Sequence, residues 1–125
     1  MYVTHVDEVK EYVVRKEGMK GVKVKYLIHA GVGAKKLQLR LFTIDVGGET
    51  RMESHEHEHE VFILRGKGLF RVGGQEVILG PGNVVFIESY EPHQIINVGE
   101  EPLQFICTKL TSEIPVEIRE EMEAK

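Results

Sequence analysis

The sequence predicts an all-β domain, an antiparallel sandwich or barrel, and three observations support this prediction. Turn-forming residues interrupt the 125-residue chain about every 8 to 12 residues, an interval typical of such folds. Most of the interruptions are rich in glycine, and the apolar runs between them are no longer than four residues. Apolar and polar residues alternate in at least one segment, as expected for a strand with one buried face.

The first strands are expected at residues 22–30 and 37–45, separated by a turn at residues 31–33. In the second segment Leu37, Leu39 and Leu41 alternate with Gln38 and Arg40. Arg40, Phe42 and Ile44 therefore share one face and Leu39 and Leu41 the other, and either face is compatible with the inside of a barrel. A turn at residues 46–48 is predicted to end this strand.

Seven further strands are expected after that turn. They are predicted at residues 51–55, 59–65, 68–72, 75–79, 83–87, 93–98 and 102–109. The two glycines at positions 73 and 74 suit a two-residue hairpin, because glycine tolerates the positive φ angles of a type I′ turn.

The whole chain, residues 1–125, is predicted to be a single domain with a barrel core at about residues 22–110. Residues 1–16 are expected to supply an N-terminal edge strand, with an irregular segment as the alternative. Residues 111–125 are expected to form a C-terminal tail whose pattern after Pro115 is mildly helical.

Composition argues against several classes of partner. The chain has 16 basic and 20 acidic residues, a net charge of −4, and no cluster of Lys and Arg, so neither nucleic acid nor an anionic membrane surface is an expected partner. Cys107 is the single cysteine and excludes an intrachain disulfide, which favours a reducing compartment. The N-terminus has no apolar segment of the kind found in signal peptides, and we expect a cytoplasmic protein.

Histidine and glutamate alternate from His55 to Glu60, and His93 follows in a separate segment. Alternation of this kind is compatible with a solvated strand face. An internal position and direct continuation into an apolar run argue against a tag-like tract. Three imidazoles and one carboxylate that converge from different strands would form a site for a divalent metal ion.

The geometry of a strand limits which residues of this tract can share an ion. Residues i and i+2 lie about 6.7 Å apart on one face, whereas residues i and i+4 lie about 13 Å apart. The chain must therefore turn within the tract. If His55 and His57 formed the pair, the next strand would offer only an apolar residue as the third ligand. If Glu53 and His55 form the pair, the turn falls at residues 56–58 and His59 opens the next strand.

The spacing of these residues resembles the two sequence motifs of the cupin family. Gly47, Glu53, His55, His59 and Gly66 follow the intervals of the first motif, G-x5-H-x-H-x3–4-E-x6-G. Gly82, His93 and Asn97 follow those of the second, G-x5-P-x-G-x2-H-x3-N. The resemblance extends over about residues 37–108 and is to the small single-domain cupins of the cupin-2 type. It implies a jelly-roll barrel, also described as a double-stranded β-helix.

By this resemblance the metal ligands are Glu53, His55, His59 and His93. Two departures concern their order, since the family has histidine at the position of Glu53 and glutamate at the position of His59. Glu88 and Tyr90 replace the proline and glycine of the second motif, which leaves the shape of the loop before His93 open. A carboxylate at position 53 is also compatible with an indirect, hydrogen-bonding role, and His57 is then the alternative fourth ligand.

The resemblance also implies a function. Four ligands on an ion that accepts six leave positions for a small molecule. We expect a metal-dependent enzyme that acts on a small oxygenated organic molecule by dioxygenation, isomerisation or decarboxylation, with manganese, iron, nickel, zinc or copper as the ion. A non-catalytic ligand-binding or sensor module is the alternative. A homodimer is expected from the family, with residues 3–14 as the contact segment.

The other reactive side chains have simpler expected roles. His5 and His29 have no partner motif and are expected at the surface, as are Glu56, Glu58 and Glu60. Cys107 shares a strand face with Phe105, so it is either a small core residue or part of the pocket wall.

Overall fold

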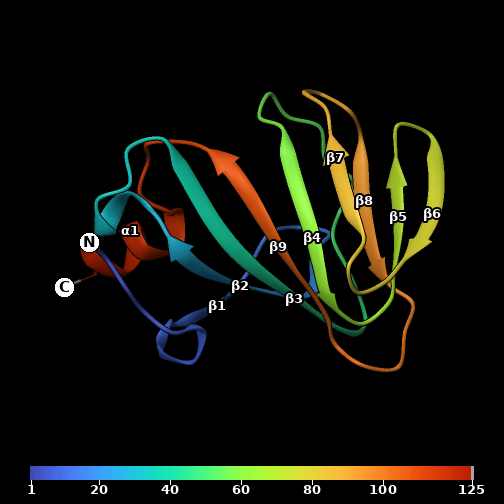
Figure 1. Ribbon diagram of the computed structural model, residues 1–125, viewed down its shortest axis with the longest axis horizontal. Coiled ribbons are helices and arrows are strands. Elements are labelled where there is room, and N and C mark those ends of the chain that lie inside the picture. The colour runs from blue at the N-terminus through green and yellow to red at the C-terminus, as the bar shows by residue number, and fades with distance from the viewer. Residues whose placement is uncertain (125) are drawn as a thin grey trace.

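The protein is built mainly from antiparallel strands that curl into a half-open barrel, as the computed structural model of residues 1–124 shows (Figure 1). The strands are β1 (Glu11–Val13), β2 (Lys20–Ile28), β3 (Leu37–Glu49), β4 (His59–Arg65), β5 (Gly68–Val72), β6 (Gln75–Leu79), β7 (Val84–Ile87), β8 (His93–Asn97) and β9 (Leu103–Leu110). Two short 3-10 helices (Val6–Glu8 and Ala30–Val32) and one α-helix, α1 (Val116–Glu123), complete the chain. The predicted all-β jelly-roll architecture is confirmed.

Strand β3 joins the two halves of the barrel. The pairing order is β6-β5-β8-β3-β9-β4-β7, and β2, with β1 at its edge, also pairs with β3. The segment of β3 before residue 45 pairs with β9, whereas its last residue, Glu49, pairs with Ile96 of β8. β3 thus passes from one half of a single curled sheet to the other, and the sheet encloses the inner faces of both halves.

Two boundary predictions around this crossing are wrong. A turn was expected at residues 46–48, but β3 continues through it to Glu49. Gly47 takes a φ of 78° there, and the register against β2 shifts between the pairs Lys20–Glu49 and Val22–Ile44, so the glycines bend the strand instead of ending it. Residues 51–55 were expected to be a strand, but only Glu53 pairs, as an isolated bridge to His93.

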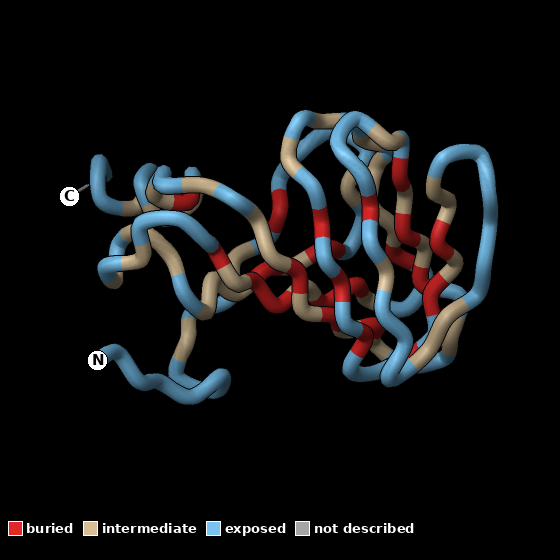
Figure 2. The backbone as a smooth tube through the Cα atoms, turned by 45° about the horizontal axis from the view of Figure 1, so that its top comes forward, coloured by how far each residue is buried: buried red, intermediate tan, exposed pale blue. Residues whose placement is uncertain are grey.

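The inner face of β3 carries Arg40, Phe42 and Ile44, which decides between the two orientations left open by the sequence. Ile44 is fully buried in the core, whereas Leu37 on the opposite face is 55% exposed. Buried positions concentrate in the curled sheet, whereas the N-terminal segment is mostly exposed (Figure 2). The largest fully buried side chains are Phe70, Ile44, Ile63, Ile87, Leu103, Val22 and Val24.

Both chain ends lie on the side of the molecule opposite β5 and β6 (Figure 1). Within residues 1–16 the edge strand is confined to β1, which pairs with β2. The predicted tail at residues 111–125 contains α1, and its last residue, Lys125, lies outside the described residues. None of the helices in residues 1–124 combines the length and apolar character that a membrane crossing requires.

Candidate metal centre

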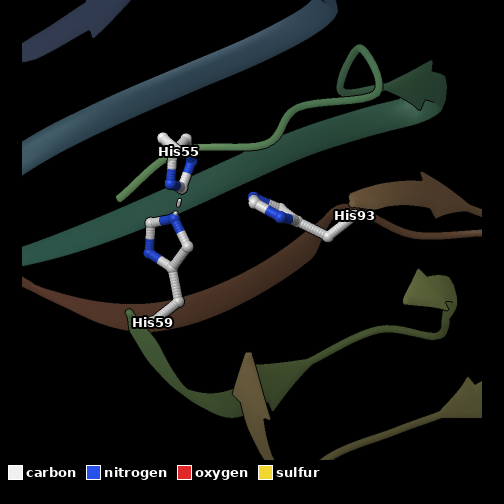
Figure 3. Close-up of side chains that lie close together, drawn as sticks. All are labelled: His55, His59 and His93. Carbon is white, nitrogen blue, oxygen red and sulfur yellow. Dashed lines mark hydrogen bonds between the residues drawn. The ribbon is translucent and has the colours of Figure 1, made fainter. Parts of the chain in front are cut away.

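Three histidines from separate segments meet on the inner face of the barrel (Figure 3). His59 is the first residue of β4, His93 is the first residue of β8, and His55 lies in the connection before β4. One ligand nitrogen from each lies within 4.8 Å of the other two. Among residues 1–124 this is the group whose geometry suits a metal ion.

Backbone hydrogen bonds hold the connection before β4 against the start of β8. Glu53 and His93 exchange two such bonds of 2.9 Å, and the Tyr90 amide donates to the carbonyl of His55 at 2.7 Å. The chain then bends at residues 56–57 and enters β4 at His59. The predicted turn at residues 56–58 is therefore present. The alternative of a solvated strand face holds for the glutamates of the tract, which are exposed, but not for its histidines, which line the cavity.

The hydrogen bonds of two histidines determine which nitrogen is free to bind an ion. Nδ1 of His93 lies 2.9 Å from the carbonyl oxygen of Glu91, and Nδ1 of His55 lies 3.2 Å from that of His57. A carbonyl oxygen only accepts, so each Nδ1 must carry the proton and each Nε2 keeps its lone pair. Metal-binding histidines are commonly fixed in this way through their second nitrogen.

The third histidine has an equivalent arrangement with a sulphur atom. Nδ1 of His59 lies 3.0 Å from Sγ of Cys107 and 3.3 Å from Nη2 of Arg40. The guanidinium cannot accept a hydrogen bond, so in the tautomer with a free Nε2 the Nδ1–H donates to Cys107. Cys107 is thus both a buried core residue and a contact of the site.

The distance between the free nitrogens suits a common ion. Nε2 of His59 lies 3.1 Å from Nε2 of His55. With metal–nitrogen bonds of about 2.1 Å, two neighbouring ligands at a right angle are about 3.0 Å apart. The pair therefore already has the separation of adjacent ligands around one ion.

Burial keeps the imidazoles of His55, His57 and His59 neutral. It is the largest cause that lowers the pKa of His59 to about 2, and the positive charge of Arg40 adds to it. The pKa of His57 is lowered to about 3, and that of His55 is lowered, again mainly by burial. Neutral imidazole is the form that binds a metal ion.

These shifts predict that the metal-free protein loses stability in mild acid. The unfolded chain takes up protons on these three histidines below about pH 6.5, whereas in the folded protein they stay neutral, so stability is complete above that pH and falls as the pH decreases. For His59 the expected loss between pH 7.5 and pH 5 is about 2 kcal/mol. His57 should add less, because solvent screens it more.

Chemical denaturation at a series of pH values, with a chelator present, measures this loss. A His59→Gln variant should show a shallower dependence over the same range, whatever its absolute stability. An identical slope in the variant and the parent would contradict the assignment of the effect to His59.

Glu53 and His57 lie beside the three histidines but outside the group that meets the ligand distances. An Oε2 of Glu53 lies 3.4 Å from Nη2 of Arg51, and its side chain is 23% exposed. The ring of His57 stacks on that of His55, with centroids 3.8 Å apart. Both residues line the same cavity as the three histidines. Their roles as fourth ligand and alternative ligand stay predictions.

The remaining two histidines have local structural roles. Nδ1 of His5 accepts a hydrogen bond from the amide of Asp7, and Nδ1 of His29 accepts one from the amide of Gly31. Each caps a 3-10 helix. Neither belongs to the metal-binding group, as expected from the sequence.

A cavity of about 170 Å³ opens beside the histidines. Its wall is part apolar and part polar, with Val61, Ile87, Ile95 and Phe105 among the apolar lining residues, and it also includes Cys107. Three cationic side chains line it as well: Lys16, Arg40 and Lys109. Sequence reasoning did not identify them as site residues. The one indication in the sequence was that Arg40 shares a strand face with Phe42 and Ile44, one of the two faces that could line the barrel.

Comparison with known proteins identifies relatives with similar architecture. The family profile described as Cupin domain matches residues 40–109. The solved structure of a polyketide cyclase from Streptomyces resistomycificus superposes with a TM-score of 0.84 at 30% sequence identity, over 92% of this chain and 82% of that one.

Two curated relatives match a shorter segment. The 1-methylthio-D-xylulose 5-phosphate methylsulfurylase of Rhodospirillum rubrum is 36% identical over 70 residues, 56% of this chain and 45% of that protein. The oxalate-binding protein of Thermotoga maritima is 37% identical over 62 residues, 49% of this chain and 51% of that protein. The match thus spans about half the length of these two relatives.

Proposed function

The chain belongs to the cupin family, and from this premise we propose that it binds a divalent metal ion and acts as a metal-dependent enzyme on a small oxygenated organic molecule. The observation that carries the proposal is the convergence of His55, His59 and His93 on one point beside a cavity. The orientation of His55 and His93, fixed by carbonyl acceptors, supports it further.

We propose that these three histidines hold the ion and that Glu53 completes the site, with His57 as the alternative. Imidazole and carboxylate donors suit manganese, iron, nickel, zinc or copper. A divalent ion in this position would polarise a carbonyl or carboxylate oxygen of a bound molecule. His59 begins β4, which pairs with β7, and His93 begins β8, which pairs with β5. The sheet therefore keeps both ligands in place.

The reaction class we propose is dioxygenation, isomerisation or decarboxylation. Support for an enzyme comes from the names of two relatives, a polyketide cyclase and a methylsulfurylase. A second candidate is a non-catalytic module that binds a small ligand through the metal, and the oxalate-binding relative favours it.

Metal content followed by turnover tests this proposal. Elemental analysis of the purified protein should give about one divalent ion per chain, and the loaded protein should then turn over at least one member of a panel of hydroxy, oxo and dicarboxylic acids, assayed with and without oxygen. A bound ion that raises stability without any turnover would favour the binding module. A protein that takes up none of the five metals would overturn both candidates.

We also propose that the protein is a cytoplasmic homodimer. Apolar side chains remain exposed along the N-terminal segment, at Tyr2, Val3, Val6 and Val13. Phe62, Val84 and Phe86 form a second exposed apolar group on the paired strands β4 and β7. Surfaces of this kind are commonly covered by a partner subunit. Light scattering should report twice the 14.2 kDa chain mass at micromolar concentration, and a monomer there would exclude the dimer.

A further inference from the structure

Arg40 is a buried cation whose hydrogen-bonding groups are mostly unused. It lies on the inner face of β3 and is 9% exposed. Its Nη2 donates a hydrogen bond to Sγ of Cys107 at 3.2 Å and lies 3.3 Å from Nδ1 of His59, which carries a proton in the metal-binding tautomer and then accepts no bond. Nε is buried and has no acceptor among residues 1–124. The guanidinium also packs over the ring of Phe42, 4.9 Å from its centroid.

A buried guanidinium with unused N–H donors is unfavourable unless another group accepts hydrogen bonds from it. A buried charge without a partner costs free energy, and a buried N–H without an acceptor adds to that cost. No ion pair between Arg40 and a carboxylate is present in the described part of the chain. Arg40 lines the cavity beside the three histidines, and its Nη1 has no hydrogen-bond partner among residues 1–124 and is not fully enclosed. A molecule bound in the cavity is therefore placed to accept a hydrogen bond from Nη1 and to offset the charge of the guanidinium.

The cavity wall carries more positive than negative side chains. Lys16 and Lys109 line the cavity together with Arg40, against the carboxylates of Glu53 and Glu117. Both carboxylates already have donors, since Glu53 accepts from Arg51 and Glu117 accepts from the hydroxyl of Tyr26. Neither lysine has an ion-pair partner within residues 1–124.

The cations are close enough to influence one another. Burial lowers the pKa of Lys109, and the charges of Arg40 and Lys16 lower it further, while Glu113 and Glu53 act in the opposite direction. A divalent ion held by the histidines would increase this positive excess. An anion would reduce it.

We propose that Arg40, assisted by Lys109 and Lys16, binds the carboxylate of a small organic acid in this cavity. The planar fork of arginine matches a carboxylate, with which it forms strong charge-assisted hydrogen bonds. The cavity volume of about 170 Å³ is close to that of a cavity of about 150 Å³ that binds benzene, so an acid of a few carbon atoms fits.

The position of Arg40 relates this anion subsite to the proposed metal site. Its Nη2 contacts Nδ1 of His59, whose Nε2 is the nitrogen turned toward His55. The two subsites therefore lie on either side of one imidazole ring. An acid with a second oxygen, such as a 2-hydroxy acid, could place that oxygen at the ion. This second contact rests on the proposed function, whereas the contact with Arg40 does not.

Calorimetric titration with lactate and with its neutral amide, lactamide, tests the anion subsite. The protein is titrated in the metal-free and the manganese-loaded form, at low ionic strength. Lactate should bind at least tenfold more tightly than lactamide in both forms. Arg40→Gln should remove most of this preference, Arg40→Lys should retain part of it, and Lys109→Met should weaken lactate about threefold and reduce its dependence on salt.

Arg65→Gln serves as the matched control, because Arg65 is exposed and pairs with Glu101 outside the cavity. It should leave lactate binding unchanged. If Arg40→Gln does not fold, the lactate preference of the parent and its reduction in Lys109→Met still decide the matter. Equal affinity of the parent for lactate and lactamide would overturn the inference, as would unchanged binding in a folded Arg40→Gln variant.

The titrations of the metal-free and the metal-loaded protein separate this inference from the proposed function. Arg40-dependent binding of lactate by a protein that takes up none of the five metals would support the anion subsite and count against the metal enzyme. Manganese uptake without any preference for lactate would have the opposite meaning.

Discussion

Replacing His93 by alanine is expected to reduce the bound metal from about one ion per chain to roughly a tenth or less. The variant loses one of three converging nitrogens, and the remaining pair comes from a single bend of the chain, at His55 and His59. Changing only the groups that orient a metal ligand typically weakens binding by about 10- to 100-fold. The loss of the ligand itself should exceed that range.

Elemental analysis and thermal unfolding measure this effect independently. Free metal at about 100 times its dissociation constant should stabilise the parent by about 2.7 kcal/mol, and this gain should disappear in His93→Ala. His55→Ala should behave in the same way. His29→Ala is the matched control, since His29 caps a short 3-10 helix and packs against Tyr26, outside the group of three histidines. Equal metal content in the parent, His55→Ala and His93→Ala would exclude the proposed site.

The fold was predictable because the turn-formers and the alternation of polarity are local signals. Strands β4, β5 and β6 have the predicted bounds, and turns that contain glycine separate them. The errors occur where a glycine has a different role. Gly47 and Gly48 bend β3 where it crosses from one half of the sheet to the other. A Cβ at Gly48 would lie 2.5 Å from the carbonyl oxygen of Lys20. A close approach of two strands depends on tertiary contacts, and the local sequence carries no signal for it.

The histidine site was predictable from parity and spacing, because strand geometry excludes three ligands on one straight segment. The loop before His93 was not. Tyr90 stands at the glycine of the family motif and keeps a glycine-like backbone, with a φ of 63°. Its amide donates to the carbonyl of His55, and its carbonyl accepts from Ser54. Hydrogen bonds at both ends hold a conformation that the side chain alone disfavours.

The cationic wall of the cavity was also beyond reach of the sequence. Arg40 and Lys109 come from paired strands, β3 and β9, whereas Lys16 comes from the loop after β1. Which of them faces the cavity depends on how the barrel curls and on where the N-terminal segment lies. Neither property has a periodic signature.

Substituting Gly66 by alanine is expected to destabilise the protein by at least about 3 kcal/mol, from two separate causes. Gly66 has a φ of 86°, a left-handed conformation that costs other residues about 1–2 kcal/mol. In addition, a Cβ there would lie 2.6 Å from the carbonyl oxygen of Pro102 and 2.8 Å from Cα of Leu103. Leu103 is fully buried, so its backbone has little freedom to move away.

Gly82→Ala separates the two causes. Gly82 has nearly the same φ, 89°, but a Cβ there would have no neighbour within 4 Å. Its substitution should therefore cost only the conformational part, about 1–2 kcal/mol. Urea denaturation of both metal-free variants gives the difference, which measures the clash between β4 and the start of β9. Equal losses would mean that this close approach does not constrain Gly66, and the family motif would then require glycine at this position for its backbone angle alone.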